Sequence, residues 1–493
     1  MLNRLKNENG IALPAVLFIM VIVVILGFTA LAIAENQTIL VRNHQQREQA
    51  LHYAEAGIHS YTARLNNNSA YYTTAESIAL QGTDIAFEKG SYNLTVTAPS
   101  ITNPAVTIRS TGKVQNSNNS RTVEVELRKK QFTQNLMTTH TGNDIFWYVN
   151  RYMRGDIVNG PLHVNGDLVV NGFNGDGSSG PEFYGPVTYS GSYKIEGLSL
   201  GTTVFHAGNP VKVERTAVPQ MNESIEAKAD HIYVGRTCIY LQGNSVTVRN
   251  QQSDSSESLT IPETGMVIYV KGGSGNNKWS SATGNVYVSG ALNGRLTIVA
   301  ENDIYITATD PTVWSKPNSS ATPAASGGVT YSDLGSASSI NSGNIETVMA
   351  SCDDMLGLIA NRNVRILHMN WPSQTGYWTD WGSPKEKDVA PVSMNIHAAI
   401  LAVTGSFEYE EPLQGPKKGA LTVIGSITQY KTGPIAGFGP NILDLPGRWD
   451  LLHERLSGYG KAYYHDPRFM YDLPPNFLEP VNSGWEIVTW REL

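Results

Sequence analysis

The feature that decides the fold is an uncharged stretch near the N-terminus, Ile11–Ala34, which reads IALPAVLFIMVIVVILGFTALAIA. A short leader with two basic residues, Met1–Gly10, precedes it, and a polar segment that favours helix, Glu35–Leu65, follows it. As a helix, these 24 residues are long enough to cross the roughly 30 Å hydrocarbon core of a bilayer. The sequence therefore predicts a transmembrane helix at 11–34 that holds the chain at a membrane by its N-terminal end.

Two simpler interpretations of this stretch remain open. A cleaved signal peptide has an apolar region of about 7–15 residues before a small-residue cleavage site. The run here is longer, although Ala30, Ala32 and Ala34 supply small residues. A plain signal anchor is the other interpretation. Because Arg4 and Lys6 favour an N-terminus in the cytoplasm, we expect a single-pass protein with the remaining chain outside the cytoplasm.

The junction between the leader and the apolar stretch carries a more specific pattern. Gly10-Ile11-Ala12-Leu13 resembles the site where prepilin peptidase cuts type IV pilin-like precursors, between the glycine and the apolar helix. Further on, Ala54-Glu55-Ala56-Gly57 resembles a segment of PilX-type N-terminal regions, which belong to minor pilins and related pilus-assembly proteins. The resemblance covers about the first 65 residues. It implies processing between Gly10 and Ile11, with prepilin peptidase, the membrane and other pilin-like subunits as partners.

One position departs from the pattern of major pilins. Most of them carry a glutamate as the fifth residue of the mature helix, and counting from Ile11 that position is Ala15. An unpaired carboxylate is costly in lipid, so its absence does not harm membrane insertion. Within the resemblance, Ala15 argues against a self-polymerising major subunit and favours a minor or initiating one.

The segment after the membrane predicts a helix packed on a small β unit. One stripe of the helix is apolar at spacings of three and four, and consists of Leu51, Ala54, Ile58, Tyr61 and Leu65. Three runs that alternate apolar and polar residues follow, at 92–97, 105–109 and 122–127. The resemblance implies this plan for a pilin-like head. We therefore predict an extracytoplasmic helix at 35–69 and a pilin-like antiparallel β unit at 70–130.

From about residue 150 onward, short apolar runs recur and glycine-containing turns separate them. Examples are Gly155–Gly160, Leu162–Gly166, Asp167–Gly172, Arg295–Ala300 and Val364–Ile366. Short strands with a turn after each are typical of a solenoid. We predict a mainly β chain with a linker at 131–149, a right-handed parallel β-helix at 150–440 and a C-terminal cap at 441–493. An antiparallel β-sandwich is the alternative for the large region.

Asparagines lie between several of these runs. Asn302, Asn361 and Asn363 are at points where the chain must turn between two strands. Because asparagine tolerates a left-handed backbone conformation, we expect these residues to make tight corners.

Composition and cysteine content restrict the function. Only 16% of the residues are charged and the net charge is −7, so we expect no nucleic-acid partner. Cys238 and Cys352 leave two alternatives open, a disulfide, which an extracytoplasmic compartment permits, or two buried thiols. No HExxH, CxxC or GxSxG motif is present. We therefore expect no enzyme, assign no catalytic residue, and expect neither metal nor cofactor.

Tryptophans in one stretch are the remaining candidates for a binding site. Trp371, Trp378 and Trp381 lie among glycines, prolines and charges and are candidates for contact with a partner subunit or a glycan. A loop that buries its own aromatic rings is the alternative.

The sequence thus predicts a membrane-anchored, pilin-like structural subunit or assembly factor of a type IV pilus or related filament at the cell surface. Two other classes stay open: a large minor pseudopilin of a type II secretion system, and a surface-anchored β-helix protein that binds or cleaves carbohydrate.

Overall fold

The computed structural model describes residues 12–129, 131–141, 151–171, 180–196, 203–215, 225–313, 323–334, 340–341, 343–368, 388–412, 415–439, 454–478 and 484–493. The chain forms two compact units. Unit 1 comprises Met1–Pro99, Ala105–Lys129 and Gly484–Leu493, and unit 2 comprises Ser100–Pro104 and Lys130–Ser483. Most of unit 2 is therefore inserted in the sequence between two segments of unit 1.

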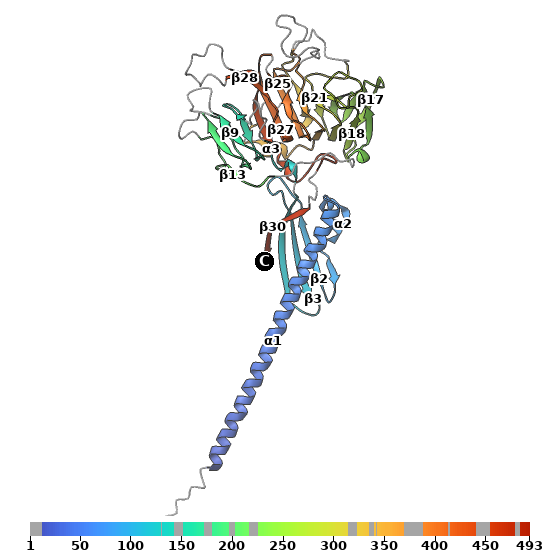
Figure 1. Cartoon of the computed structure of the whole chain (residues 1–493). Coiled ribbons are helices and arrows are strands. Elements are labelled where there is room, and N and C mark those ends of the chain that lie inside the picture. Colours follow the sequence, from blue (N-terminus) through green and yellow to red (C-terminus); the bar gives the residue numbers. More distant parts are fainter. Residues whose placement is uncertain are drawn as a thin grey trace, which may run out of the picture. The chain divides into compact units, whose positions relative to one another are not determined.

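One continuous helix begins unit 1. The helix α1 (Ala12–Asn67) joins the two predicted helices, 11–34 and 35–69, into a single element of 56 residues (Figure 1). The helix is long and apolar enough to cross a membrane by its length and composition, as predicted. In its second half most of the predicted stripe is buried: Ala54, Ile58 and Leu65 are 0% exposed, whereas Leu51 is partly buried.

A five-stranded antiparallel sheet packs against the second half of α1. Its strands are β1 (Asp84–Phe87), β2 (Gly90–Thr97), β3 (Val106–Val114), β4 (Ser120–Lys129) and β30 (Trp485–Glu492), in that order across the sheet. The short helices η2 (Tyr71–Thr73) and α2 (Ala75–Leu80) connect α1 to β1. Apolar side chains of the sheet, among them Leu94, Ile108 and Val125, form one core with the α1 stripe. The antiparallel unit predicted at 70–130 is thus present, with one strand more than these residues supply.

That additional strand comes from the far end of the chain. β30 pairs with β4 from Trp485 opposite Lys129 to Glu492 opposite Val123, with one register shift after Ile487. The prediction that the whole tail, 441–493, caps the β-rich region is therefore wrong for Trp485–Glu492. A strand shows its own β-propensity in the sequence, but it shows nothing about a partner more than 350 residues away.

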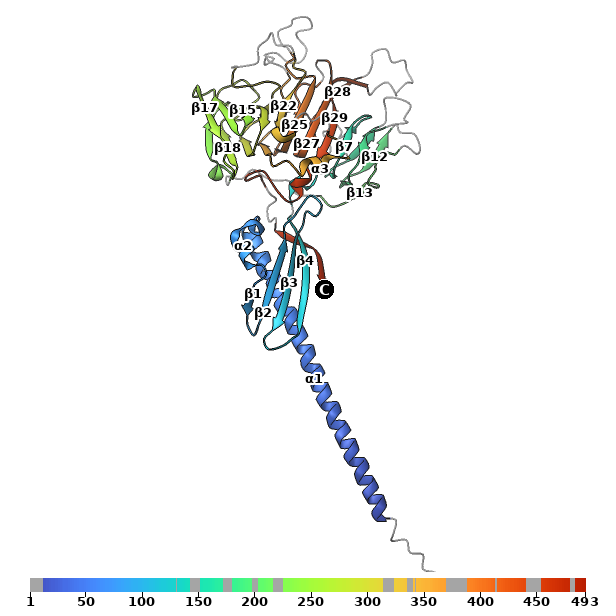
Figure 2. The same ribbon diagram turned by 180° about the vertical axis from the view of Figure 1, so that it is seen from behind.

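Unit 2 consists mainly of short strands paired in parallel, as Figure 2 shows for its central strands. One row runs through β14 (His231–Val234), β18 (Met266–Lys271), β20 (Arg295–Ala300), β23 (Met355–Ala360), β25 (Ser393–Ala402) and β27 (Lys417–Lys431). A second row runs through β15 (Thr237–Gly243), β19 (Val286–Leu292), β21 (Ile304–Ile306), β24 (Val364–Ile366) and β26 (Phe407–Tyr409). β22 (Ser326–Tyr331) pairs with both β19 and β25. Equivalent side chains lie next to one another, so that Ile298, Leu358 and Ile400 form a buried apolar column.

The rows do not follow the order of the chain throughout. β27 pairs with β29 (Glu454–His465) along its first half and with β5 (Met137–Thr141) near its end. The rows continue from these two strands through β7 (Ile157–Asn159), β8 (Leu162–Val164), β10 (Glu182–Phe183), β11 (Val187–Tyr189) and β13 (Val211–Lys212). The N-terminal and C-terminal ends of unit 2 therefore meet within the stack. The predicted linker, 131–149, is wrong where it includes β5.

Smaller elements complete unit 2. A separate sheet contains β6 (Arg151–Tyr152), β9 (Leu168–Asn171) and β12 (Tyr193–Glu196). Antiparallel pairs involve β16 (Ser245–Asn250), β17 (Ser255–Thr260) and β28 (Ala436–Gly439). Short helices are η3 (Phe132–Gln134), η4 (Glu226–Lys228), η5 (Ser332–Leu334), α3 (Ile345–Met349) and η8 (Pro467–Met470). Segment 469–478 contributes Phe469, Phe477 and Leu478 to an apolar cluster with Val299, Ile359 and Leu401.

The large sheet confirms the mainly β fold with a parallel arrangement. Its predominantly parallel pairing differs from the antiparallel sheets of the β-sandwich alternative. Closure of the rows into a right-handed helical solenoid stays a prediction.

Candidate functional site

The residues singled out in the sequence are only partly within the described chain. Gly10 and Ile11 lie outside it, and so do Trp371, Trp378 and Trp381. Cys238 and Cys352 are both free and buried, which favours the second alternative for the cysteines. Burial raises the pKa of Cys238 to about 12 and that of Cys352 to about 11, so both thiols stay protonated at neutral pH. They act as small apolar side chains in the core.

The first half of α1 exposes more large apolar side chains than any other part of the described chain. Its large apolar side chains from Leu13 to Ile33 are between 40% and 73% exposed, on all sides of the helix. Its two threonine hydroxyls donate to backbone carbonyls one turn earlier, Thr29 to Leu26 and Thr38 to Ala34, both at 2.8 Å. A helix that is apolar all round is stable only when lipid or other apolar helices surround it. We call Leu13–Ala34 the apolar segment.

The second half of α1 approaches the sheet very closely at small residues. A Cβ atom on Gly112 of β3 would clash with the backbone carbonyl oxygen of Ala50 and the backbone nitrogen of Ala54. A Cβ atom on Gly57 would clash with the Ser110 side chain of β3. The Ala54–Gly57 motif therefore has a packing function in this chain, because a side chain at Gly57 would separate the helix from β3.

Polar contacts fix β30 to the rest of unit 1. The carboxylate of Glu124 on β4 is 5% exposed and accepts from Arg109 Nη2 of β3 at 2.6 Å and from Arg491 Nε of β30 at 2.7 Å. These two guanidinium groups, Arg109 first, lower the pKa of Glu124. Thr489 donates to Glu126 at 3.0 Å. The contacts of Arg491 and Thr489 were not predicted, since they join residues that are adjacent only after β30 has paired with β4.

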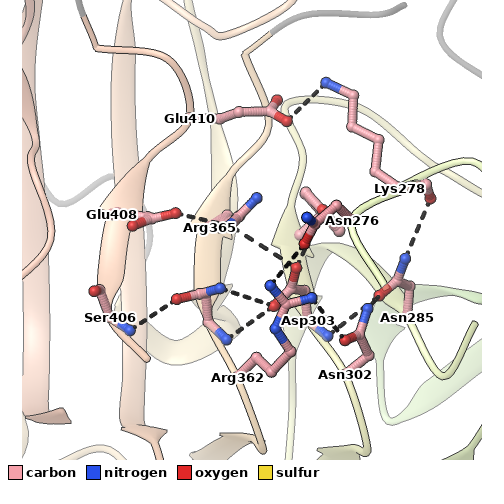
Figure 3. A network of polar contacts seen from close by, with 12 residues as sticks. Asn276, Lys278, Asn285, Asn302, Asp303, Arg362, Arg365, Ser406, Glu408 and Glu410 are labelled. Atoms are coloured by element: carbon pink, nitrogen blue, oxygen red, sulfur yellow. Dashed lines mark hydrogen bonds and ion pairs between the residues drawn. The ribbon is translucent and has the colours of Figure 1, made fainter. Parts of the chain in front are cut away.

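A ladder of polar side chains runs across the second row of unit 2 (Figure 3). Asn285, Asp303, Asn363 and Ser406 each precede a strand of that row, and all are at least 92% buried. Asn285 Oδ1 accepts from the Asp303 amide at 3.2 Å, Asp303 Oδ1 from Asn363 Nδ2 at 3.0 Å, and Asn363 Oδ1 from the Ser406 amide at 3.0 Å. The ladder satisfies backbone groups at the corners of successive levels.

The asparagines lie at the corners where they were predicted, but their backbone is not left-handed as expected. Asn302 and Asn363 lie between successive strands, as expected, but neither they nor Asn361 has a positive φ. Asn302 instead donates to Asn285 at 2.6 Å, and Asn363 bonds Asp303. Hydrogen bonding between levels, not a left-handed backbone, explains Asn302 and Asn363.

Buried charges next to the ladder are paired. Arg365 lies 2.8 Å from Glu408, and Lys278 lies 2.7 Å from Glu410, as Figure 3 shows. Both members of the second pair are less than 10% exposed. Because each carboxylate faces a cation, the arrangement is that of a structural network, and it offers no free carboxylate pair for acid–base chemistry.

One group of side chains has the composition of a metal site. Ligand atoms of Asp333, Cys352 and Asp354 lie within 4.8 Å of one another. The Asp354 carboxylate, however, accepts from the Gly294 amide at 2.7 Å, and burial raises its pKa. The guanidinium of Arg468 also bonds the Asp354 carbonyl oxygen at 2.9 Å. The backbone amides of Gly294 and Asp333 already donate to the Asp354 carboxylate, and Arg468 places a positive charge beside it, so these contacts describe a structural polar cluster.

Comparisons with known proteins add little. No protein-family model matches the sequence, and no curated protein matches it significantly. Among solved structures, the chain is similar to the competence-associated pilin ComZ from Thermus thermophilus, with 9% identity, a TM-score of 0.28, and coverage of 91% of this chain and 98% of that one. A TM-score this low carries no argument, so the function must be inferred from the chain itself.

Proposed function

We propose that the protein is a membrane-anchored, pilin-like structural subunit or assembly factor of a type IV pilus or related filament, and not an enzyme. One observation carries the proposal. A single helix has an apolar first half without a packing partner among the described residues and a second half fixed to an antiparallel sheet. Such a helix holds a folded head at a membrane and offers its apolar half to lipid or to other apolar helices.

Sequence features near the N-terminus support the orientation of the chain in the membrane and the processing of its leader. Arg4 and Lys6 favour a cytoplasmic N-terminus, which leaves both β-rich units outside the cytoplasm. On this proposal, prepilin peptidase cleaves between Gly10 and Ile11. The absence of a carboxylate at Ala15 favours a minor subunit over a self-polymerising one. The glycan hypothesis rests on Trp371, Trp378 and Trp381, and no described contact adds to it.

The mature N-terminus tests the proposal. We expect mass spectrometry of protein extracted from its native membrane to give Ile11 as the first residue. Gly10→Leu should retain the leader, whereas the neighbouring control Asn9→Ala should be processed normally. A mature chain that begins at Met1 would leave a plain signal anchor, and one that begins after Ala34 would indicate a cleaved signal peptide. Either result would contradict the proposal.

A further inference from the structure

We propose that the last ten residues, Gly484–Leu493, are a latch that occupies a strand-accepting site on unit 1, so that this unit is completed only after unit 2 has folded. The inference concerns the order in which the chain is completed, and it goes beyond the proposed function. It stands on the β4 edge, the end of α1 and the course of the chain through unit 2.

The accepting site has two walls. The edge of β4 pairs with β30 at seven register positions, from Lys129 to Val123. The C-terminal end of α1 supplies the other wall, where Trp485 Nε1 donates to the Leu65 carbonyl oxygen at 3.2 Å and the Trp485 amide donates to Asn66 Oδ1 at 3.1 Å. The last carbonyl groups of a helix have no partner within it, so the latch satisfies one of them.

The site is also selective in charge. Glu124 and Glu126 lie two residues apart on β4, where alternate side chains share one face of the sheet. The latch presents Arg491 and Thr489 to them in the same spacing. A second ion pair joins Arg121 of β4 to Glu492. An extended peptide needs a basic residue and a hydroxyl at these positions to match the site, and Gly484–Leu493 provides both.

The course of the chain makes occupation of the site depend on unit 2. About 350 residues separate β4 from the latch, and bringing two such distant segments of an unfolded chain together carries a large loop-closure entropy. In folded unit 2 the two ends meet. His465 Nε2 lies 2.7 Å from the Thr133 carbonyl oxygen, and Thr133 Oγ1 donates to the Phe469 carbonyl oxygen at 3.0 Å. Folding of unit 2 therefore shortens the effective connection from about 350 residues to roughly twenty, those between Lys129 and Thr133 and between Phe469 and Trp485, and raises the local concentration of the latch.

Without the latch, β4 is an open edge strand. Open edges pair with other strands and are sites of aggregation. A chain that is still incomplete, or whose unit 2 is misfolded, would thus present an unfinished unit 1 beside its membrane helix. The latch makes a finished unit 1 a sign that unit 2, which precedes the latch in the sequence, has folded.

Amide hydrogen exchange of the full chain in detergent micelles tests the latch. We compare the intact protein, a deletion of 484–493, and a control, Val488→Ala, whose side chain is half exposed at the register shift. The deletion should raise exchange at β4 by roughly tenfold or more while unit 2 amides stay protected. The control should match the intact protein. Unchanged β4 exchange in the deletion would overturn the proposal, and so would loss of protection throughout unit 2.

A synthetic peptide of residues 484–493 provides the rescue. Added in trans to the deletion protein, it should restore protection of β4 with a saturable dose dependence. The same peptide with Arg491→Glu should not, because it places a carboxylate against Glu124. Equal rescue by both peptides, or rescue by neither, would contradict a selective accepting site.

Unfolding in urea tests whether the pairing of β4 with β30 depends on folded unit 2. In the intact protein, urea should remove protection from β4 and β30 at the concentration that unfolds unit 2, or below it. Persistence of the β4–β30 pairing after unit 2 has unfolded would overturn the dependence. None of these measurements involves a filament or processing of the leader, so their failure is distinguishable from failure of the proposed function.

Discussion

Units 1 and 2 are both rich in β-strand and both contain pairs of distant segments, but they differ in how many levels share the load. In unit 2 most strands pair with the strand of the next level, and the ladder from Asn285 to Ser406 repeats one type of contact. Unit 1 depends on two contacts, α1 against β3 and β30 against β4, and the second joins opposite ends of the chain. Damage at one level of unit 2 should therefore weaken that level most. In unit 1, loss of the contact between α1 and β3 should unfold the unit, whereas loss of β30 should leave β4 as an open edge strand.

The helix–sheet contact of unit 1 is expected to give the largest effect. Gly112→Val should destabilise unit 1 by about 3 kcal/mol, because the new side chain meets the backbone of α1 at Ala50 and Ala54. Gly27→Ala in the apolar segment is the control, since nothing lies within 4 Å of a Cβ atom there. Urea unfolding followed by exchange of unit 1 amides measures both. An unchanged midpoint for Gly112→Val would mean that the close approach does not stabilise unit 1.

The polar ladder of unit 2 gives the matching test. Asp303→Ala should cost about 3 kcal/mol, because it leaves the buried Asn363 amide without its acceptor and removes a carboxylate near Arg365. The exposed Asp353→Ala should change stability by less than about 0.5 kcal/mol. Denaturant unfolding of unit 2 separates the two variants. Equal stability would contradict a structural function of the ladder.

Acid should destabilise unit 2 at a higher pH than unit 1. Burial, with the nearby Arg468 guanidinium, lowers the pKa of His397 from 6.5 to about 3, while Tyr331 contributes an amide that donates to the ring at 3.0 Å. The unfolded chain therefore binds a proton below pH 6.5 that the folded chain does not, so unit 2 loses stability as the pH falls from 6.5 toward 3. The expected loss from His397 between pH 7 and pH 5 is about 2 kcal/mol.

Unit 1 should respond at lower pH. The pKa of Glu124 is lowered from 4.5, so its contribution is present above pH 4.5 and is lost as the pH falls below that value. Urea unfolding at pH 7 and pH 5, read separately in each unit, makes the comparison. His397→Gln should reduce the pH dependence of unit 2. Parallel loss of stability in both units between pH 7 and pH 5 would count against this account.

The smallest effect is expected at the surface of the β30 contact. Arg109→Ala and Arg491→Ala should each raise the pKa of Glu124, and Arg109→Ala should raise it more because its hydrogen bonds are the largest cause of the shift. Unit 1 should stay folded in both variants, since each leaves Glu124 with one guanidinium. NMR titration of the Glu124 carboxyl measures the shift. A larger effect of Arg491→Ala would reverse the assigned order.

Local pattern predicted much of this structure. The apolar stretch from Ala12, the stripe from Leu51 to Leu65 and the alternating runs of β2–β4 depend on neighbours in the sequence, and all lie in the elements expected. The order of levels in unit 2, the position of β5 and the pairing of β30 depend on partners far away in the chain. Trp485–Glu492 has the composition of a strand, but nothing in it identifies Lys129 as its neighbour.

The candidate site was likewise predicted only where it depends on local sequence. The apolar segment follows from composition, whereas the Glu124 contacts with Arg109 and Arg491 exist only after the fold has formed. The Ala54–Gly57 motif was noted for its resemblance to pilin-like regions, and its packing against Ser110 and Gly112 became evident only with β3 beside it.

Photocrosslinking in the native membrane tests the central claim most directly. A photoreactive residue at Val23, which is 59% exposed, samples the apolar segment, and one at Ile58, which is fully buried, is the control. The account predicts adducts between Val23 and the apolar helix of another pilin-like subunit, and no adducts with other chains from Ile58. Adducts of Val23 with lipid alone would contradict the account and leave α1 as a plain membrane anchor.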